Sequence, residues 1–366
     1  MRKVKVISVV GARPNFIKVA PLHNEFLKYS SRFDHFICHT GQHFDWNMST
    51  VFFKDLKLPE PHFYLGVGGG SHAQQTAGVM IEFEKVMMRE EPDLVIVVGD
   101  VNSTLACSIT SAKLNTKVAH VEAGLRSFDN TMPEEINRKI TDACADYLFV
   151  SEPSGLQNLK AEGVSDSRVF YVGNIMIDSL ISCLPTVDKS TILEQLSLKR
   201  EEYILITFHR PSNVDHKERL ADLIVFLNHL AKAIPIVFPV HPRTRDKMKK
   251  FGLAEKLSGN IVLTEPVGYI DFIALEKNAR LVITDSGGIQ EETTYLAIPC
   301  ITVRENTERP ITVDVGTNIL GGTDFARIKI YADEILSGKI KKGQIPKLWD
   351  GQVAQRIVSI IDKLFE

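Results

Sequence analysis

The segment ITDSGGIQEE, Ile283–Glu292, combines residue types that suit the binding of a phosphorylated ligand. A β-branched run ends at Asp285 and is followed by Ser286, Gly287 and Gly288, which predicts a turn from a strand into a helix. Backbone N–H groups at a helix N-terminus bind anions, and glycines let a phosphate approach the backbone closely. We therefore expect this turn to bind the diphosphate of a nucleotide.

Two adjacent acids, Glu291 and Glu292, follow the glycines. A carboxylate in contact with phosphate would repel it, so we expect one of them to accept both hydroxyls of a ribose. The structural alternative is that the acids stabilise the helix dipole. The first apolar run is not followed by G-x-G-x-x-G, and the sequence contains no G-x-x-x-x-G-K-[ST], so neither a dinucleotide-binding site nor a P-loop is predicted.

Similar chemistry recurs at the ends of other apolar runs. In open parallel sheets, ligands bind outside the carboxyl ends of the strands. Six such ends carry ionisable or glycine-rich residues: Gly11–Pro14 with Lys18 beyond it, Gly99–Asp100, Glu122–Gly124 with Arg126 beyond it, His209–Arg210, His241–Arg243 and Asp285–Gly288. We expect these six tips to face one cleft.

Short β-rich runs must place these tips, and they alternate with helical patterns. The predicted strands are 4–10, 35–38, 94–98, 118–121, 147–150, 169–172, 203–207, 236–240, 261–263, 281–284 and 300–303. Strands that are apolar throughout and separated by helices indicate parallel sheets covered on both faces. The sequence therefore predicts an α/β protein with two Rossmann-like domains, 1–174 and 175–351, and a final helix, 352–366, that packs back on the first domain.

Composition limits the classes of function. A chain of 366 residues fits two domains, and its net charge of −2 gives no basic field for nucleic acid or an anionic membrane. Five scattered cysteines without a C-x-x-C pair indicate reduced thiols in a cytoplasmic protein, with no metal site. The first apolar run stops at Gly11, too early for a signal peptide, and no stretch is long enough to span a bilayer.

Ten motifs together resemble the non-hydrolysing UDP-N-acetylglucosamine 2-epimerases, which share the two-domain GT-B architecture with the active site in the interdomain cleft. The resemblance runs from Val9 to about Pro310. The matching segments are VVGARPNFIKVAPL, HTGQHFDWNMS, VVGDVNSTLA, AHVEAGLRS, MPEEINR, VGNIMIDSL, FHRPSNVD, PVHPR, ITDSGGIQEE and ENTERP.

The reaction implied by this resemblance has a chemical difficulty. The proton on sugar C2 is not next to a carbonyl, so inversion needs either oxidation by NAD or expulsion of UDP to give a glycal. The missing dinucleotide motif favours expulsion, and we expect no cofactor. The resemblance implies anti elimination of UDP followed by re-addition, which requires a base on one face of C2 and an acid on the other.

The resemblance also implies roles for individual residues. Its acid/base candidates fall on Asp100, Glu122, Glu134 and His209. The structural alternatives are a helix cap for Asp100, an ion pair with Arg126 for Glu122, a first-turn acid for Glu134 and a hydrogen-bonded core histidine for His209. Its substrate-binding candidates are Arg13 and Lys18 for phosphate or sugar, Ser286, Gly287 and Gly288 for the diphosphate, Glu292 for the ribose and Phe272 for uracil. His241 and Arg243 are expected to line the cleft, and no step is assigned to them.

Two departures from the family pattern leave the substrate open. The loop SFDNTM is shorter than in the best-known bacterial enzymes, as in relatives that epimerise UDP-2,3-diacetamido-glucuronic acid, and HRPSN replaces HRREN. Gln42 and His43 match a second, activating UDP-GlcNAc site, whereas FDWN after them does not. A GT-B glycosyltransferase and a nucleotide-sugar sensor are the other classes considered. We expect the protein to form a homodimer and to bind a nucleotide sugar.

Overall fold

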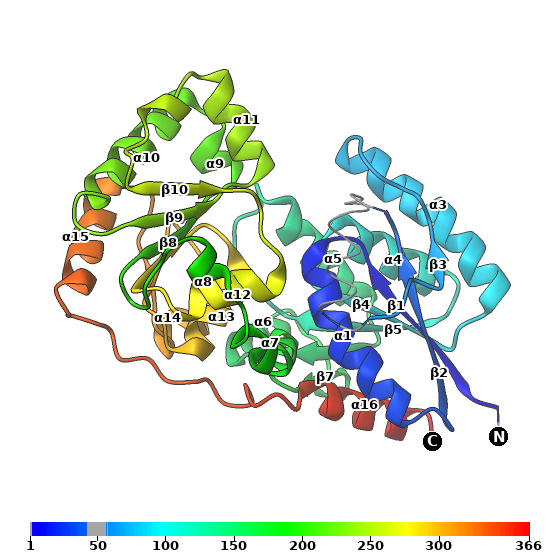
Figure 1. Cartoon of the computed structure of the whole chain (residues 1–366). Helices are drawn as coiled ribbons and strands as arrows, with labels where there is room; N and C mark the ends of the chain where they lie inside the picture. Colours follow the sequence, from blue (N-terminus) through cyan, green and yellow to red (C-terminus); the bar gives the residue numbers. More distant parts are fainter. Residues whose placement is uncertain (1, 42–55, 57) are drawn as a thin grey trace. The chain divides into compact units, whose positions relative to one another are not determined.

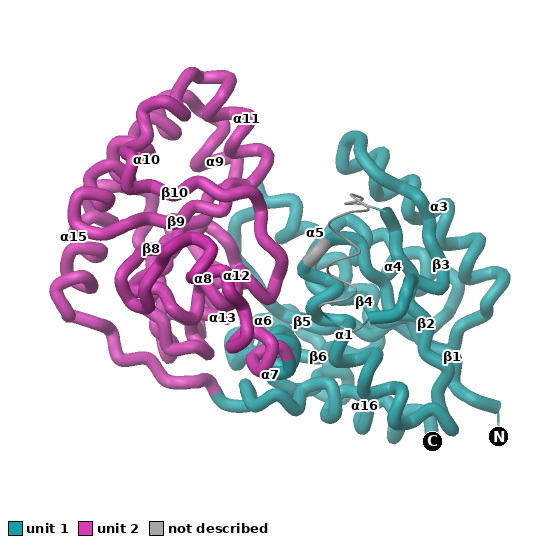
Figure 2. The backbone as a smooth tube through the Cα atoms, in the orientation of Figure 1, with its two compact units in different colours: residues 1–182, 347–366 teal, residues 183–346 magenta. Residues whose placement is uncertain are grey.

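A computed structural model describes residues 2–41, 56 and 58–366, except for the side chain of Arg13. The chain divides into two compact units (Figure 2). Unit 1 comprises Met1–Ser182 and Lys347–Glu366, and unit 2 comprises Cys183–Pro346. Each unit is built around its own parallel sheet.

Unit 1 alternates strands and helices along most of its length (Figure 1). Its elements are β1 (Val4–Val10), α1 (Arg13–Lys28), β2 (Phe33–His39), β3 (Phe63–Tyr64), α3 (His72–Glu90), β4 (Leu94–Val98), α4 (Asn102–Lys113), β5 (Lys117–Ala123), α5 (Pro133–Cys144), β6 (Tyr147–Val150), α6 (Pro153–Ala161), η1 (Asp166–Arg168), β7 (Val169–Tyr171), α7 (Ile175–Val187) and α16 (Val353–Leu364).

Unit 2 follows the same alternation. Its elements are α8 (Ile192–Gln195), β8 (Ile204–Thr207), α9 (Pro211–Val214), α10 (Lys217–Leu230), β9 (Ile236–Pro239), α11 (Pro242–Lys250), η2 (Ala254–Lys256), β10 (Ile261–Thr264), α12 (Tyr269–Lys277), β11 (Leu281–Thr284), α13 (Gly287–Leu296), β12 (Cys300–Thr302), α14 (Pro310–Asp314), β13 (Asn318–Leu320) and α15 (Phe325–Leu336).

Both sheets have the strand order of a Rossmann fold. Among the described residues the order is β3-β2-β1-β4-β5-β6-β7 in unit 1 and β10-β9-β8-β11-β12-β13 in unit 2, with every pairing parallel. The direction of winding reverses between β1 and β4 and again between β8 and β11. Ligands bind at such switch points, beyond the carboxyl ends of the strands. The two pairs of strand ends therefore mark where a site is expected.

The sequence explains why these elements form where they do. Every residue of β4 is buried, as expected for a central parallel strand with helices on both faces. Five helices begin at a proline. Its fixed φ suits the first helical position, and its lack of an N–H costs nothing there, because an N–H at that position has no acceptor within the helix. These prolines are Pro133, Pro153, Pro211, Pro242 and Pro310.

Helix α7 leads from unit 1 into unit 2. The boundary expected from the sequence lies at 174/175, and the compact units divide at 182/183, within this helix. The first half of α7 is held by unit 1: the Ser179 hydroxyl donates to the Ile17 carbonyl, and Asp178 accepts the first backbone N–H groups of α16. Helix α16 lies beside α1 (Figure 1), and its Asp362 pairs with Arg32, in the turn between α1 and β2.

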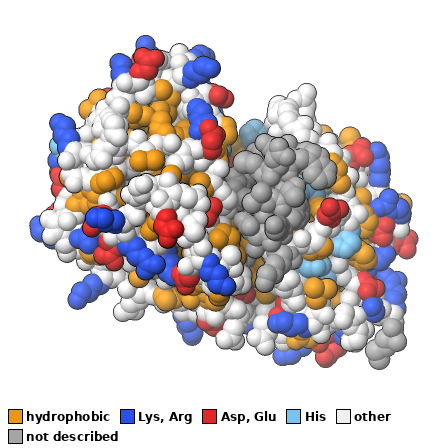
Figure 3. Space-filling view, in the orientation of Figure 1, with side chains coloured by type: hydrophobic (Ala, Val, Ile, Leu, Met, Phe, Trp, Pro, Cys, Tyr) orange, Lys and Arg blue, Asp and Glu red, His pale blue; other side chains and the backbone are white. Residues whose placement is uncertain are grey.

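Most predicted strands are present within a residue or two, but β3 and β13 were not predicted. These strands have two and three residues, too few to show a periodic pattern. No helix in the described ranges is long and apolar enough to cross a membrane. On the face drawn in Figure 3, outside the grey area, acidic and basic side chains are interspersed.

Candidate active site

The switch point of unit 1 is held together by Asn15. Its side-chain oxygen accepts the N–H groups of Gly11 and Ala12 at 3.0 and 2.9 Å, and its amide donates to the Val98 carbonyl at 3.0 Å. A Cβ on Gly11 would lie 2.3 Å from the Ser103 hydroxyl, so only glycine fits. The ends of β1 and β4 are thus fixed against each other where α1 begins.

A buried ion pair between Lys18 and Glu122 lies at this edge. Lys18 Nζ is 2.5 Å from Glu122 Oε2, and the two side chains are 5% and 3% exposed. Arg126, the partner named in the structural alternative for Glu122, pairs with Asp142 and Glu162. Lys18 therefore serves first to neutralise a buried carboxylate.

The backbone at Glu122 is unusual. Its φ is +73°, in the left-handed region that residues other than glycine rarely adopt. The register of β5 against β6 shifts between Val121 and Ala123. Such conformations cost about 1–3 kcal/mol and cluster at functional sites. The bulge turns the Glu122 side chain toward Lys18 and Gly99, where an added Cβ on Gly99 would lie 3.8 Å from Glu122 Oε2.

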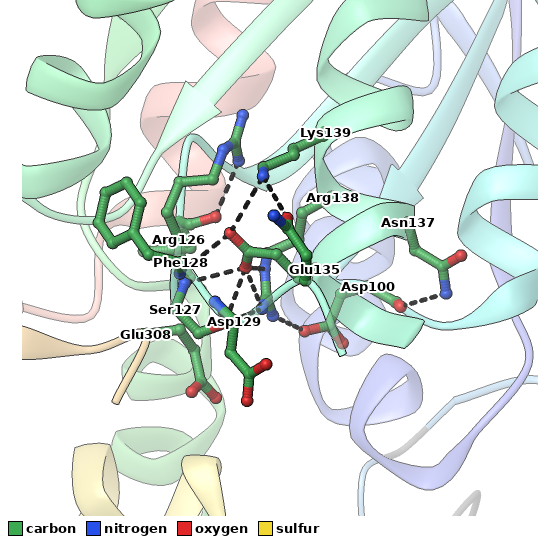
Figure 4. Close-up of polar contacts among 12 residues, drawn as sticks. Asp100, Arg126, Ser127, Phe128, Asp129, Glu135, Asn137, Arg138, Lys139 and Glu308 are labelled. Carbon is green, nitrogen blue, oxygen red and sulfur yellow. Dashed lines mark hydrogen bonds and ion pairs between the residues drawn. The ribbon is translucent and has the colours of Figure 1, made fainter. Parts of the chain in front are cut away.

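Asp100 is held by α5 rather than acting as a helix cap. The N-cap of α4 is Val101, and Asp100 Oδ2 contacts the Arg138 guanidinium (Figure 4). Asn137 donates to the Asp100 carbonyl at 2.8 Å. Neither Arg138 nor Asn137 was predicted, although MPEEINR places both one turn beyond its acids on the same helix.

The adjacent acids of α5 have different surroundings. Glu135 is fully buried; it accepts from the Ser127 amide and hydroxyl at 2.9 Å each and pairs with Arg138 at 2.6 Å (Figure 4). Burial by itself would raise the Glu135 pKa, but the Ser127 and Arg138 contacts outweigh it and the pKa is lowered. Glu135 therefore holds the 127–128 loop, whereas Glu134 is half-buried in the first helical turn.

The switch point of unit 2 carries an imidazole–carboxylate pair. His209 Nδ1 lies 2.9 Å from Asp285 Oδ1, and the His209 side chain is 39% exposed, so it is not a core histidine. Asp285 is fully buried and also accepts from the Arg210 amide at 3.0 Å and Asn213 at 3.1 Å. Burial opposes ionisation of Asp285, yet His209 and these donors lower its pKa. With Nδ1 engaged, Nε2 is the ring nitrogen left for a substrate.

The turn in which we expect an anion to bind lies between β11 and α13. Ser286 is the N-cap, its side chain makes no capping hydrogen bond, and its amide donates to Thr284 Oγ1 at 2.9 Å. The N–H groups of the first helical turn have no helical acceptor. A Cβ on Gly287 would lie 2.8 Å from both Arg309 Nη1 and Glu308 Oε1, so the turn stays bare of side chains there. Gly288 is the next residue of this turn.

The two acids of α13 also differ. Glu291 pairs with Arg309 Nε at 2.8 Å, whereas buried Glu292 accepts from the Tyr269 hydroxyl at 3.0 Å. Burial raises the Glu292 pKa to about 8; the Tyr269 hydrogen bond opposes the rise and the Glu291 charge adds to it. Phe272, half-buried, is one turn after Tyr269 on α12, so the two share a helix face. The candidate contacts for ribose and uracil therefore lie on adjoining helices.

The remaining predicted residues are only partly described. Arg13 opens α1, but its side chain lies outside the described residues, as do Gln42 and His43 entirely. The ring centroids of His209 and His241 are 5.5 Å apart. Arg243 is paired with Asp215, Nε to Oδ1 3.0 Å. In the described ranges, no group of three or more His, Cys, Asp or Glu side chains is arranged to hold a metal ion.

A family model described as UDP-N-acetylglucosamine 2-epimerase matches residues 25–362. The chain belongs to this epimerase family. It is 42% identical over 365 residues to the UDP-N-acetylglucosamine 2-epimerase of Methanocaldococcus jannaschii, covering 98% of this chain and 99% of that one. The crystal structure of the M. jannaschii enzyme in complex with UDP-GlcNAc and UDP matches with a TM-score of 0.91 at 41% identity, covering 98% of this chain and all of that one.

Membership of the UDP-N-acetylglucosamine 2-epimerase family confirms the predicted fold, two Rossmann-like α/β domains of GT-B type. A second relative differs in its substrate. The UDP-2,3-diacetamido-2,3-dideoxy-D-glucuronate 2-epimerase of Pseudomonas aeruginosa is 38% identical over 365 residues, covering 99% of this chain and 100% of that one. Both relatives invert C2 of a UDP-linked 2-acetamido sugar, according to their names.

Proposed function

We propose that the protein is a non-hydrolysing UDP-N-acetylglucosamine 2-epimerase that interconverts UDP-GlcNAc and UDP-ManNAc. The observation that carries this proposal is the pair of acids at the unit 1 switch point, each beside a cation: Glu122 beside Lys18 and Asp100 beside Arg138. Their place in a chain that is 42% identical to a UDP-GlcNAc 2-epimerase over nearly its full length supports the same assignment.

The proposed reaction has two halves. In the first, a base removes the C2 proton, the C1–C2 double bond forms and the electron pair of the C1–oxygen bond leaves with UDP. In the second, the UDP oxygen adds back to C1 while an acid delivers a proton to the opposite face of C2. Asp100, Glu122 and Glu134 supply the base and the acid, which makes both proton transfers local to unit 1.

His209 serves the diphosphate in this proposal. Asp285 fixes the ring through Nδ1, so Nε2 is available to donate a hydrogen bond or proton as negative charge develops on the leaving oxygen. The first turn of α13 stabilises the same charge with Ser286, Gly287 and Gly288. The departing UDP is thereby retained for re-addition.

The nucleotide is held mainly by unit 2. Glu292 accepts hydrogen bonds from the ribose hydroxyls, in place of or in addition to the one from the Tyr269 hydroxyl. Phe272, on the same helix as Tyr269, contacts uracil. Arg13 and Lys18 contribute positive charge toward the phosphates or sugar. No cofactor takes part in this scheme.

Incubation of the purified protein with UDP-GlcNAc alone tests the proposal. Product NMR is expected to show UDP-ManNAc in equilibrium with the substrate, without any acceptor. A protein that leaves UDP-GlcNAc unchanged, or transfers the sugar only when an acceptor is added, would contradict it.

A second candidate substrate is UDP-2,3-diacetamido-glucuronic acid. It is favoured by the 38% identity to the P. aeruginosa enzyme over nearly the whole chain and by the short SFDNTM loop. The ratio of kcat/KM for the two sugars decides between them. We also propose a cytoplasmic homodimer, which light scattering at several protein concentrations tests for its oligomeric state.

A further inference from the structure

A fully buried histidine, His120, connects two strand ends at the candidate site. It lies within β5, with Nδ1 2.6 Å from Asp142 Oδ1 and Nε2 2.8 Å from the Gly99 carbonyl oxygen. Both neighbours are acceptors when Asp142 is ionised. Each ring nitrogen of His120 therefore faces an oxygen atom that can accept a hydrogen bond.

The contacts of Asp142 favour its ionised form. Its Oδ2 accepts from the Gly124 amide at 3.0 Å and from Arg126 Nη2 at 2.7 Å. Burial alone would raise the Asp142 pKa, but His120 and Arg126 outweigh burial and lower it. His120, Asp142 and Arg126 therefore form a chain of contacts beneath the edge of the sheet.

The two backbone groups held by this chain adjoin the candidate acids. The Gly99 carbonyl belongs to the peptide bond that leads into Asp100, and the Gly124 amide lies two residues after Glu122. Gly99 and Gly124 have φ of +68° and +79°, so both peptides are turned out of strand geometry. Hydrogen bonds from buried charges hold such turns more firmly than neutral ones do.

We propose that His120 and Asp142 are positioning residues that set the directions of Asp100 and Glu122 for proton transfer at C2. This proposal rests on the proposed epimerase function. In it, His120 does not touch the substrate. It fixes the Gly99–Asp100 peptide, and through Asp142 it fixes the turn after Glu122. A displacement of about 1 Å at a reacting group can lower a rate about 100-fold.

The same strand supplies a matched control. At the amino end of β5, Asp146 accepts from the Val118 amide at 2.9 Å and from Lys117 at 2.8 Å. Like Asp142, it joins a carboxylate to a β5 amide and a cation, but it lies at the opposite end of the strand from the candidate acids. Asp146→Asn therefore reports the loss of such a contact without disturbing the site.

Three variants separate the two hydrogen bonds. His120→Gln keeps a donor near the Nε2 position, His120→Asn keeps one near Nδ1, and Asp142→Asn removes the charge. Each is expected to lower kcat about 10- to 100-fold, change the Kd for UDP less than about threefold, and raise the fraction of turnovers that release free UDP and glycal. Asp146→Asn is expected to change none of these quantities.

Equal loss of activity in Asp142→Asn and Asp146→Asn, or a lower melting temperature with kcat and glycal release unchanged, would assign the chain a purely structural role. Nitrogen-15 NMR of the histidine-labelled wild-type protein tests the two contacts of His120 without any mutation. The His120 resonances, identified by their absence in His120→Gln, are expected to show both ring nitrogens in hydrogen bonds. A ring nitrogen without a hydrogen bond would overturn the proposal. Wild-type protein that does not epimerise any UDP-sugar would instead refute the proposed function.

Discussion

Replacing Lys18 by methionine is expected to destabilise unit 1 by about 3–5 kcal/mol, because it removes one partner of a buried ion pair and keeps the Glu122 carboxylate. The pair is 2.5 Å apart and about 95% or more buried on both sides, so water cannot replace the lost charge. Exposed pairs contribute only about 0–1 kcal/mol. Lys117→Met is the matched control, because Lys117 pairs with Asp146 at 2.8 Å while 54% exposed.

The double variant Lys18→Met with Glu122→Gln makes the test sharper. It removes both charges, so it is expected to be more stable than Lys18→Met alone, with a coupling energy of about 2–3 kcal/mol. Urea unfolding followed by tryptophan fluorescence reports unit 1 through Trp349, which is buried in that unit. A cost for Lys18→Met no larger than that of Lys117→Met, or additive costs in the double variant, would refute the reasoning.

The remaining predictions concern the acids and histidines of both units. Glu134→Gln is expected to lower the epimerisation rate about 100- to 10,000-fold and to leave the UDP affinity within a few-fold. The neighbouring variant Glu135→Gln should chiefly lower the unfolding free energy. If calorimetry shows that Glu134→Gln loses UDP affinity as much as it loses activity, Glu134 has a structural role. Because Glu292 must be ionised to accept both ribose hydroxyls and its pKa is raised to about 8, UDP affinity should increase by up to about tenfold per pH unit toward pH 8, and calorimetry of Glu292→Gln should lose this dependence. Burial, with the charge of His23, holds the pKa of His35 well below 6.5. The contribution of neutral His35 to the free energy of unfolding is therefore complete above about pH 6.5 and declines as the pH falls. An unfolding free energy that stays constant between pH 7 and 5 would contradict this.

The strand ends were predictable because each element leaves a local pattern. β1, β4 and β11 have the predicted bounds, and α13 begins at Gly287, directly after Ser286, as the Ser-Gly-Gly turn indicates. Apolar runs and turn residues lie next to each other in the chain, so a single sequence records them.

The partners of the candidate acids were not predictable in the same way. Glu122 pairs with Lys18, 104 residues away, although Arg126 is four residues away in the sequence. The contact of Asp100 with Arg138 joins residues 38 apart. Such pairs are decided by which strand ends become neighbours in the sheet, and composition and spacing do not specify this. The contacts of His120 with Asp142 and Gly99 were not predictable for the same reason.

Turnover in heavy water tests the central claim most directly. If a base removes the C2 proton and a solvent-exchangeable acid returns one, UDP-ManNAc formed in heavy water carries one deuterium at C2, with no added NAD, and mass spectrometry with NMR locates it. Transient absorbance of reduced nicotinamide would indicate oxidation instead. UDP-ManNAc that retains protium fully at C2 would contradict elimination and re-addition, and with them the roles proposed for Asp100, Glu122, Glu134 and His209.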